Sequence, residues 1–496
     1  MKSQKYVGVD LGGESGRIMV GEFNGTTMHL SEQHRFATGG TELNGTLRWD
    51  VNRFWSEIKH GLSRIASSGT AELVSVGVDT WGVDYVLLGS DGQLLEWPWH
   101  YRDERTRGLL AETTNRIPRE HLFQQTGIQF LEFNSLYQLI SARKLGATLD
   151  QAKQMMMIPD YFHYCLSGQT QTEFTNATTT QCLNPSTRDW AHPLLKSFEI
   201  PVDILPEIVE PGSKVGTLCK SVRNETGLSP INVVAPATHD TGSAVAAVPV
   251  DQAYGQDWAY ISSGTWSLIG VETNTPILSE KAMKLNVTNE GGVDGTWRLL
   301  KNVMGLWLVQ RLRISLESTS TELSYGDLTR QAEASPAFTS LIDPDCPQFL
   351  NPPNMLESIT HFCRTTSQPI PSSAGQAVRC VLESLALKYA TVLKSLEELT
   401  GRNVRVMHIV GGGSQNALLN QFVANACQVP VVAGPSEATA YGNLLVQCRS
   451  AGSLNSLADI REVVRRSSTL EYFEPKHTSV WIEAQDRFET LTRQLV

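Results

Sequence analysis

The sequence lacks paired cysteines, basic runs and long apolar stretches, and each absence narrows the class of protein. Its eight cysteines are scattered without a CxxC pair, so we expect reduced thiols rather than a zinc site or a redox pair. The net charge of −10 and the absence of a basic block disfavour nucleic acid or an anionic membrane as the main partner. No stretch approaches the ~20 apolar residues that span a bilayer. No signal peptide precedes the first apolar segment, so we expect a cytoplasmic protein.

Several nucleotide-binding and hydrolase motifs are also missing. No G-x-x-x-x-G-K-[ST] occurs, so the chain is not a P-loop enzyme. No G-x-G-x-x-G follows a strand, which leaves a dinucleotide-binding fold with little support. HExxH and GxSxG are absent as well. If the protein binds a nucleotide, other glycine turns must hold the phosphates.

The length and the pattern of predicted elements indicate two α/β domains. A chain of 496 residues is too long for one hydrophobic core, which stops growing near ~250–300 residues. Residues 6–23 read as strand, glycine turn and strand, and residues 259–271 repeat that pattern. Helices are predicted over 51–65 and 374–400, with Gly401 as a C-cap and Ser414 as a candidate cap of the next helix. We expect domains over 1–248 and 249–496 that face each other across a cleft.

Three glycine-rich turns follow predicted strands, at Gly12–Arg17, Ser262–Thr265 and Gly411–Gly413. Phosphate binding needs backbone N–H groups that converge without Cβ atoms in the way, so such turns are the expected structure. A single glycine turn between strands is usually only a turn. Three of them, each at a strand end and shared between both halves, favour phosphate binding.

Aspartates also stand at strand ends, at Asp10 and Asp79, and Asp240 lies in a polar loop after another strand. An ionised carboxylate at the carboxyl edge of a sheet is unfavourable unless it meets a cation, a proton donor or water. A magnesium ion on ATP and a substrate hydroxyl are two such partners. The alternative, an aspartate that bonds to its own turn, stays open for each residue alone, but their shared location favours a functional site.

Taken together, these residues resemble the motif series of the FGGY carbohydrate kinases, in the order and spacing of that family. The motifs that carry the resemblance are Val7–Gly12 with Ser15–Arg17, Thr238–Thr241, Ser262–Thr265 and Gly411–Asn416. The resemblance implies an α/β fold of two actin-like (ribonuclease H-like) ATPase domains flanking a central cleft. It also implies ATP-dependent, magnesium-dependent phosphorylation of a small sugar.

Other segments are similar to those of the family members that phosphorylate L-rhamnulose at its C1 hydroxyl. These segments are Asp79–Asp84, Tyr101–Thr106, Gly127–Phe130 with Phe133 and Asn134, Thr175–Thr180 and Lys301–Trp307. Trp81-Gly82 stands where xylulose kinases carry Met-His, so we expect an indole face in the sugar pocket. The partners implied are ATP, Mg²⁺ and this sugar, and the chain is compatible with a monomer or a dimer.

The resemblance also assigns roles to single residues. Asp240 matches the catalytic base, and the sugar-contacting positions are matched by Gly82, His239, Asp240, Thr241 and Asn302. The nucleotide-contacting positions are matched by Gly13, Glu14, Ser15, Gly16, Arg17, Thr265, Gln310 and Gly412. Asp10 is added as a carboxylate on the magnesium side. Glu14 departs from the small residues usual there, and either points away from the phosphates or helps to hold the metal.

Two alternatives remain at this point. One is another ketose in the same fold and reaction, L-fuculose or a pentulose. The other is an actin-like ATPase that serves as a chaperone or filament subunit, which would share the phosphate turns but need no base beside a sugar. A chaperone would add a large β-rich domain, whereas only about fifty residues follow Gly442 here, and they read as helical.

Overall fold

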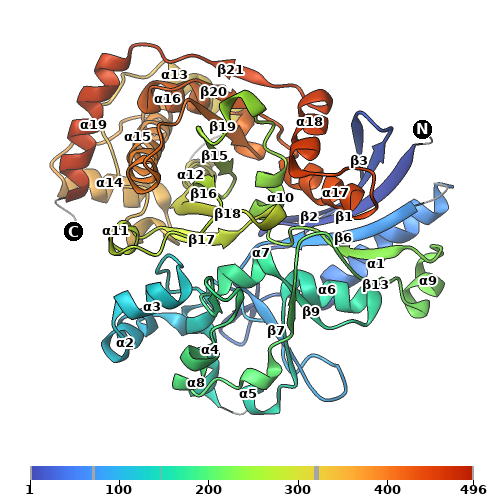
Figure 1. Cartoon of the computed structure of the whole chain (residues 1–496). Helices are drawn as coiled ribbons and strands as arrows, with labels where there is room; N and C mark the ends of the chain where they lie inside the picture. Colours follow the sequence, from blue (N-terminus) through green and yellow to red (C-terminus); the bar gives the residue numbers. More distant parts are fainter. Residues whose placement is uncertain (1–2, 70–72, 147, 318–322, 494–496) are drawn as a thin grey trace. The chain divides into compact units, whose positions relative to one another are not determined.

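The computed structural model describes residues 3–69, 73–146, 148–317 and 323–493, and the chain forms two compact units (Figure 1). The first unit contains residues 1–249, 272–299 and 438–467, and the second contains residues 250–271, 300–437 and 468–496. Both units are therefore discontinuous in sequence. The division at 248/249 expected from the sequence stays a prediction.

The first unit is built on a six-stranded sheet of order β13-β14-β6-β1-β2-β3. The bounds are β1 Gln4–Leu11, β2 Ser15–Phe23, β3 Met28–Ala37, β6 Leu73–Thr80, β13 Ser213–Thr217 and β14 Asn232–Ala235. Strands β1 and β2 form an antiparallel hairpin around the first glycine turn, while β1, β6 and β14 run parallel. Because parallel strands end at the same edge, the carboxyl ends of these three strands lie side by side.

Alternation along the strands gives the two faces of this sheet different characters. Val7 and Val9 of β1 belong to the apolar core that helix α1 (Val51–Ser67) covers. On the opposite face Gly8 packs against Leu444 of helix α17 (Ala438–Ser450). A Cβ on Gly8 would lie 3.4 Å from the Leu444 side chain. Asp10, two residues beyond Gly8, therefore points to the α17 face. The sheet thus has one mainly apolar face, toward α1, and one that carries the polar strand ends.

Asp240, expected from the sequence in a polar loop, is the first residue of a helix. Helix α10 follows β14 and spans Asp240–Ala246. Its N-cap is His239, and a short bridge joins Thr80 to His239, with the Thr80 N–H donating to the Thr238 carbonyl at 2.9 Å. An acidic residue in the first turn of a helix interacts favourably with the helix dipole, so Asp240 suits this position.

Further elements of the first unit position the site. They are β9 Gln171–Glu173, α7 Phe174–Ala177, the 3₁₀ turn η2 Thr178–Thr180, β17 Thr288–Gly291 and α18 Leu457–Ser467. Strand β7 (Tyr85–Leu88) pairs with β8 (Gln154–Met157). Strand β18 (Trp297–Met304) begins in the first unit and continues into the residues of the second.

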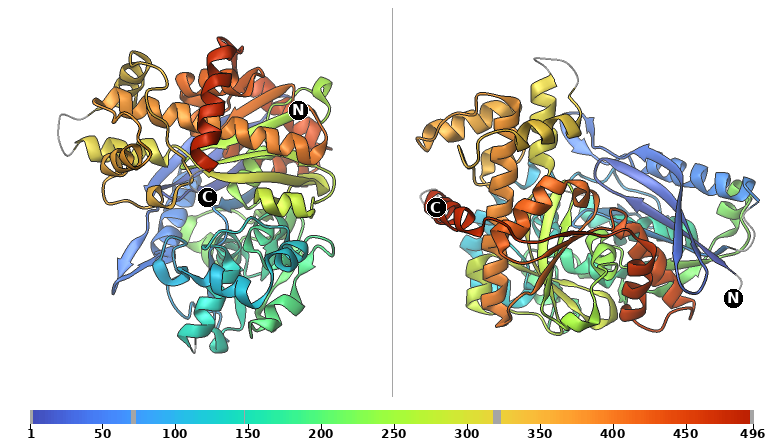
Figure 2. Two further views of the ribbon diagram at one scale, coloured as in Figure 1. Left: turned by 90° about the vertical axis from the view of Figure 1, so that its left-hand side faces the viewer. Right: turned by 90° about the horizontal axis from the view of Figure 1, so that it is seen from above.

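The second unit contains a mixed sheet, in which β15, β19 and β20 run parallel, together with helices (Figure 2). Its strands follow the order β16-β15-β19-β20-β21, with bounds Trp266–Thr273, Trp258–Ser263, Val406–Val410, Val431–Ala433 and Glu471–Phe473. Its helices are α12 Trp307–Glu317, α13 Tyr325–Glu333, α14 Met355–Thr365, α15 Ala374–Thr400, α16 Ala417–Cys427 and α19 Thr478–Arg493. Strand β15 forms an antiparallel hairpin with β16 and runs parallel to β19, so the turns after β15 and β19 share one edge.

The long helix predicted over 374–400 is confirmed, including its end. Gly401 has φ 68°, the left-handed conformation that glycine adopts at low cost. The prediction that Ser414 caps the next helix is wrong. Residues 412–415 form a 3₁₀ turn in which Ser414 Oγ donates to the Gly411 carbonyl, and Asn416 caps α16 by accepting from the Leu419 N–H at 3.0 Å.

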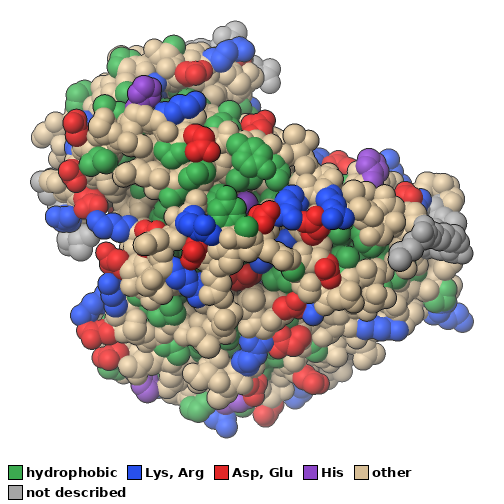
Figure 3. All heavy atoms as spheres, turned by 45° about the horizontal axis from the view of Figure 1, so that its top comes forward, with side chains coloured by type: hydrophobic (Ala, Val, Ile, Leu, Met, Phe, Trp, Pro, Cys, Tyr) green, Lys and Arg blue, Asp and Glu red, His purple; other side chains and the backbone are tan. Residues whose placement is uncertain are grey.

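Charged side chains of both signs are interspersed on the face drawn in Figure 3. Interspersed charges partly offset one another at a distance, so that face presents a mixed rather than a single-sign field. Among the described helices, none is both long and apolar enough to cross a membrane.

Candidate active site

Three aspartates gather where β1, β6 and β14 end in the first unit. Asp10 of β1 and Asp79 of β6 are direct register partners in parallel strands. Asp240 follows β14 as the first residue of α10. The sequence placed these carboxylates at strand ends, and the sheet order brings the three strands into adjacent positions.

Asp240 is the most exposed of the three carboxylates. Asp79 is fully buried, and the Asp10 side chain is 9% exposed, whereas the Asp240 side chain is 32% exposed. Burial, with a smaller contribution from the nearby Asp10 charge, raises the pKa of Asp79 well above its usual range. Burial also raises the pKa of Asp240, and His239 opposes this shift. Asp240 is therefore the group of the three best placed to exchange a proton with a bound molecule.

The first glycine turn is closed by the backbone and braced by an ion pair. The Gly12 N–H donates to the Ser15 carbonyl at 2.9 Å, and Arg17 Nη2 lies 2.5 Å from Asp10 Oδ2. Gly13 has no atom within 4 Å of the position that a Cβ would take, so its outer side is open. The Glu14 side chain is exposed.

Gly16 has a different reason to be glycine. A Cβ there would meet the Phe36 ring at 2.6 Å and Leu11 at 2.8 Å, so the close packing of the hairpin requires its absence. Of the residues in this turn, Gly13 leaves room for an approaching ligand, while Gly16 serves the core.

A chain of side-chain hydrogen bonds connects Asp79 to helix α17. Asn443 Nδ2 donates to Asp79 Oδ2 at 2.5 Å, and Gln447 Nε2 donates to Asn443 Oδ1 at 2.6 Å. Ser75 Oγ donates to Gln447 Oε1 at 2.6 Å. The other oxygen of Asp79 is buried without a hydrogen-bond partner among the described residues. A neutral, protonated carboxyl suits this position, because an unpaired buried charge is costly.

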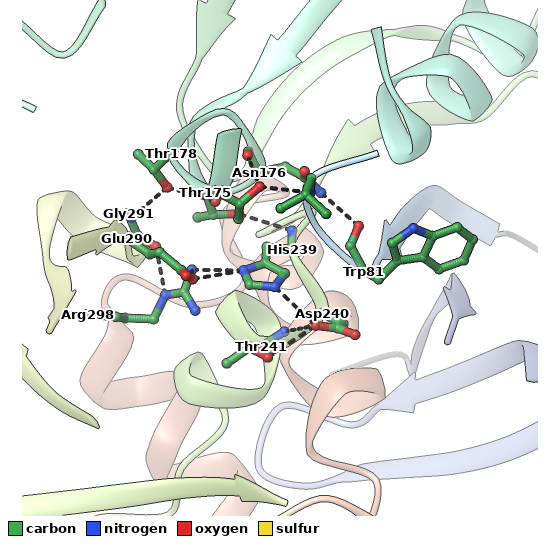
Figure 4. A network of polar contacts seen from close by, with 12 residues as sticks. Trp81, Thr175, Asn176, Thr178, His239, Asp240, Thr241, Glu290, Gly291 and Arg298 are labelled. Atoms are coloured by element: carbon green, nitrogen blue, oxygen red, sulfur yellow. Dashed lines mark hydrogen bonds and ion pairs between the residues drawn. The ribbon is translucent and has the colours of Figure 1, made fainter. Parts of the chain in front are cut away.

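His239 is held between Asp240 and a buried ion pair (Figure 4). Its Nε2 lies 3.4 Å from Asp240 Oδ1, and its Nδ1 lies 3.1 Å from Glu290 Oε2. Arg298 Nη2 lies 3.1 Å from the same Glu290 oxygen. The backbone of His239 is also fixed, since its N–H donates to Thr175 Oγ1 at 3.1 Å. Thr241, the third residue of this group, donates through its N–H and its hydroxyl to Asp240 Oδ1.

Gly82 lies in a strained segment beside this site. A Cβ at Gly82 would stand 2.9 Å from Thr179 Oγ1, and the next residue, Val83, has φ 66°. This conformation is rare for a β-branched residue and persists only where the surroundings impose it. Here the Val83 N–H donates to Thr179 Oγ1 at 3.0 Å, while its carbonyl accepts from Ser135 Oγ.

Trp81 is only 8% exposed and packs within an aromatic cluster. Its ring lies 4.1 Å from that of Trp49, and the Nε1–H groups of both indoles donate to Asp84 Oδ2. Burial raises the pKa of Asp84 to about 6. Trp81 therefore offers little surface, and its contact with a sugar stays a prediction.

The second unit holds the remaining predicted positions. Thr265 lies in the β15–β16 turn, where its carbonyl accepts from the N–H groups of Gly305 and Trp307 at 3.2 Å. Asn302 lies in β18 and Gln310 in α12. Gly412 lies in the turn after β19 and has no atom within 4 Å of the position of a Cβ.

Two of the three glycine turns meet in the second unit. A Cβ at Gly411 would stand 2.9 Å from the Ser263 carbonyl, and a Cβ at Gly413 would stand 2.0 Å from Ser263 Oγ. The turns at Ser262–Thr265 and Gly411–Gly413 are therefore packed together. This packing requires glycine at Gly411 and Gly413. Gly412, between them, is the glycine of this turn that faces open space.

Sequence reasoning missed Glu290 and Arg298, and it grouped Asp79 with the other strand-end aspartates without giving it a role. Arg298 lies on β18, among apolar residues, whereas Glu290 lies on the short polar strand β17. A charged residue inside the apolar strand β18 was the available signal for Arg298, because buried charges are seldom found unpaired, and Glu290 had no such signal. Asn443 had no comparable signal, since its partner Asp79 lies 364 residues away.

Among the described residues no group of three or more His, Cys, Asp or Glu side chains could hold a metal ion by itself. Magnesium bound with a nucleotide does not need such a group, because it is usually held by one or two carboxylates together with phosphates and water. Asp10 supplies a carboxylate of this kind at the strand edge, and it fits that limited role.

Comparisons with known proteins identify the fold and the family of the chain. Gluconate kinase and xylulose kinase from Lactobacillus acidophilus superpose with TM-scores of 0.83 and 0.82 at 16% identity, covering 100% and 99% of this chain and 98% of each structure. The fold is thus the two-domain α/β fold of the sugar kinases, as predicted.

Models of the FGGY family of carbohydrate kinases match residues 5–247 with the N-terminal domain and residues 259–451 with the C-terminal domain. The chain belongs to this family. A rhamnulokinase from Bacteroides thetaiotaomicron is 44% identical over 99% of this chain and 100% of its own length. One from Bacillus subtilis is 41% identical over 95% of each chain.

Proposed function

We propose that the protein transfers the γ-phosphoryl group of ATP to the C1 hydroxyl of L-rhamnulose, giving ADP and L-rhamnulose 1-phosphate. The observation that carries the proposal is Asp240, the most exposed of the three carboxylates at the strand edge, with His239 and Thr241 beside it. The relatives named as rhamnulokinases, similar over the full length, favour this sugar over L-fuculose or a pentulose.

In the mechanism Asp240 acts as the general base. Its carboxylate accepts the proton of the C1 hydroxyl while the hydroxyl oxygen bonds to the γ-phosphorus and the bond from phosphorus to ADP breaks. General-base catalysis of this kind contributes about 10²–10⁴-fold to the rate. Burial raises the pKa of Asp79, which favours its protonated form and so limits the negative charge at this strand edge. Gly82, His239, Thr241 and Asn302 are the positions proposed to contact the sugar.

The nucleotide is proposed to contact Gly13–Arg17 in the first unit and Thr265, Gln310 and Gly412 in the second. Glycine turns after strands present free backbone N–H groups to phosphates. Asp10 is proposed to hold Mg²⁺ together with the phosphates, and the ion would supply charge neutralisation during transfer. The exposed Glu14 side chain has no assigned role.

The sugar is tested by kcat/KM values for L-rhamnulose, L-fuculose, D-xylulose and glycerol, with ATP and Mg²⁺ and with ADP release as the signal. L-Rhamnulose is expected to give the highest value. Burial of its methyl group contributes only ~1 kcal/mol. A sugar that leaves polar groups such as Asn302 or His239 unpaired loses a further ~1–3 kcal/mol per group. An equal or higher value for D-xylulose or glycerol would assign the chain to another substrate of the same family.

The nucleotide contact is tested at Gly412. A Cβ at Gly412 would have no atom within 4 Å, so a Gly412→Val side chain starts in open space and the fold should be retained. It should obstruct an approaching nucleotide and raise the KM for ATP at least about tenfold, which corresponds to ~1.4 kcal/mol. Steady-state kinetics at saturating sugar measure this change, with the smaller Gly412→Ala as a graded control. An unchanged KM for ATP would remove Gly412 from the nucleotide site.

A further inference from the structure

The proposed reaction gives no role to Glu173, a buried acidic residue that contacts the segment before Asp240. Glu173 ends β9 immediately before α7, and its side chain is fully buried. A buried carboxyl group is unfavourable unless hydrogen bonds replace those it makes with water. The hydrogen bonds that reach this carboxylate come from two threonines, Thr175 and Thr238.

Four hydrogen bonds converge on the two oxygens of Glu173. Oε1 accepts from the Thr175 N–H at 2.8 Å, and Oε2 accepts from the Thr175 hydroxyl at 2.5 Å. Oε2 also accepts from the Thr238 N–H at 2.8 Å and from the Thr238 hydroxyl at 2.7 Å. Each oxygen therefore accepts from one backbone N–H group, and the two N–H groups belong to different segments of the chain.

Capping of helix α7 does not explain this arrangement. Glu173 is the N-cap of α7 through its bond from the Thr175 N–H. Ser, Thr, Asp and Asn are the preferred N-cap residues, and any of these short side chains would supply that bond. A cap needs none of the bonds to Thr238, which lies 65 residues further along the chain. The longer side chain of glutamate is explained by its reach to Thr238.

Through the two threonines Glu173 fixes the backbone that leads into Asp240. It accepts directly from the Thr238 N–H. Because the Thr175 hydroxyl directs its proton to Glu173, its oxygen can accept from the His239 N–H at 3.1 Å, and Figure 4 shows Thr175 beside His239. The N–H groups of both residues before Asp240 are thus held by Glu173, one directly and the other through Thr175.

We propose that Glu173 is a positioning residue, whose carboxylate holds the backbone of Thr238 and His239 so that Asp240 is oriented toward the substrate hydroxyl. This inference rests on the proposed function, in which Asp240 is the base. Glu173 is itself anchored, since its N–H donates to Asp160 Oδ1 of helix α6 (Ile158–Ser167) at 3.2 Å. A small displacement of a catalytic group is enough to lower the rate strongly.

The first test is Glu173→Gln, which keeps the shape of the side chain but leaves it one acceptor oxygen. In either orientation the new NH₂ group meets a backbone N–H, that of Thr175 or that of Thr238, so one of these two bonds is lost. We expect kcat to fall by between about tenfold and 10²-fold. The KM for the sugar should rise severalfold, because His239 and Thr241 are proposed sugar contacts and move with this segment. The KM for ATP should not change.

Glu383→Gln is the matched control for the loss of a buried carboxylate. Glu383 is 1% exposed, pairs with Arg379 at 2.7 Å and accepts from the Phe338 N–H at 2.8 Å, all within the second unit. Loss of a purely structural carboxylate reduces the folded fraction, which lowers the apparent kcat but leaves both KM values unchanged. A parental kcat in Glu173→Gln, or a lower kcat with the KM for the sugar unchanged, would overturn the proposal.

A second pair of variants keeps the proposal testable if Glu173→Gln does not fold. Thr175→Val preserves the branched shape and removes the hydroxyl between Glu173 and the His239 N–H, whereas Thr175→Ser preserves that hydroxyl. Thr175→Ser should therefore retain more of the parental kcat than Thr175→Val. Equal kcat values for the two variants would overturn the proposal.

Hydrogen exchange measured by mass spectrometry gives a test that does not depend on catalysis. The backbone amides of residues 236–241 should exchange faster in Glu173→Gln than in the parent, and at the parental rate in Glu383→Gln. Unchanged exchange in Glu173→Gln would overturn the proposal. If the parent enzyme phosphorylates none of the sugars tested, the proposed function fails, while this measurement still decides whether Glu173 holds the segment.

Discussion

Asp240→Asn is expected to lower kcat at least about 10²-fold, with the KM for the sugar nearly unchanged. The amide keeps the shape of the side chain and can still accept from Thr241, but it cannot take a proton. Asp240 is also the most exposed of the three carboxylates at the strand edge, so neither Asp10 nor Asp79 is placed to replace it. Single-turnover measurements of ADP formation at saturating sugar separate this loss from slow product release. A rate within a few-fold of the parent would rule out Asp240 as the base.

The stability of the same variant is an internal control. Because burial raises the pKa of Asp240, the folded state favours the protonated form. A carboxyl group whose pKa is higher in the folded state than in the unfolded state lowers the stability of the protein as the pH rises above its unfolded pKa. Ionised Asp240 is therefore unfavourable to folding at neutral pH. Asn carries no charge at any pH. The denaturation midpoint of Asp240→Asn at neutral pH should therefore be no lower than that of the parent, and a clearly lower midpoint would attribute its inactivity to misfolding.

Gly442→Ala is expected to produce the largest loss of stability. Gly442 lies in α17 where that helix meets α10, and a Cβ there would stand 1.8 Å from the Ser243 carbonyl oxygen. The obstruction is backbone rather than a movable side chain, so the two helices must separate. Overpacking typically costs ~1–3 kcal/mol and occasionally more, and we expect at least about 3 kcal/mol here. Activity should fall as well, because α10 carries Asp240 in its first turn.

Chemical denaturation monitored by circular dichroism measures this loss. Gly39→Ala is the matched control, since the same change there meets no atom within 4 Å and the residue has no positive φ. That control should stay within ~0.5 kcal/mol of the parent. Equal midpoints for the two variants would show that α10 and α17 can move apart at little cost.

The sequence predicts those parts of the structure that depend on local pattern. The hairpin around Gly12–Arg17, the helix 374–400 with its glycine end and the aspartates at strand ends all follow from periodicity and turn residues. The start of α10 is less accessible to such reasoning. The apolar run begins at Ser243, but the preceding polar residues Asp240 and Thr241 are already helical, because the N-cap falls on His239.

The supporting residues could not be predicted in the same way. Asn443 and Gln447 reach Asp79 and Ser75 only because α17 covers one face of the sheet. That packing is a tertiary event between segments more than 360 residues apart, and no local propensity encodes it. The glycines also needed the structure, since spacing alone cannot separate Gly16, which packs on Phe36, from Gly13, which is open.

The discontinuity of the first unit also determines when it can fold during synthesis. Strands β1 and β6 emerge early, but α17, which covers their polar face, follows Asp79 by 364 residues at Asn443. At about 5–20 residues per second, the ribosome needs roughly 20–70 s to add that segment. For that time Gly8, Gly77 and Asp79 lack their covering helix. The unit whose strands are made first is therefore completed only after α17 has been made, and until then the polar face of its nascent sheet is left uncovered.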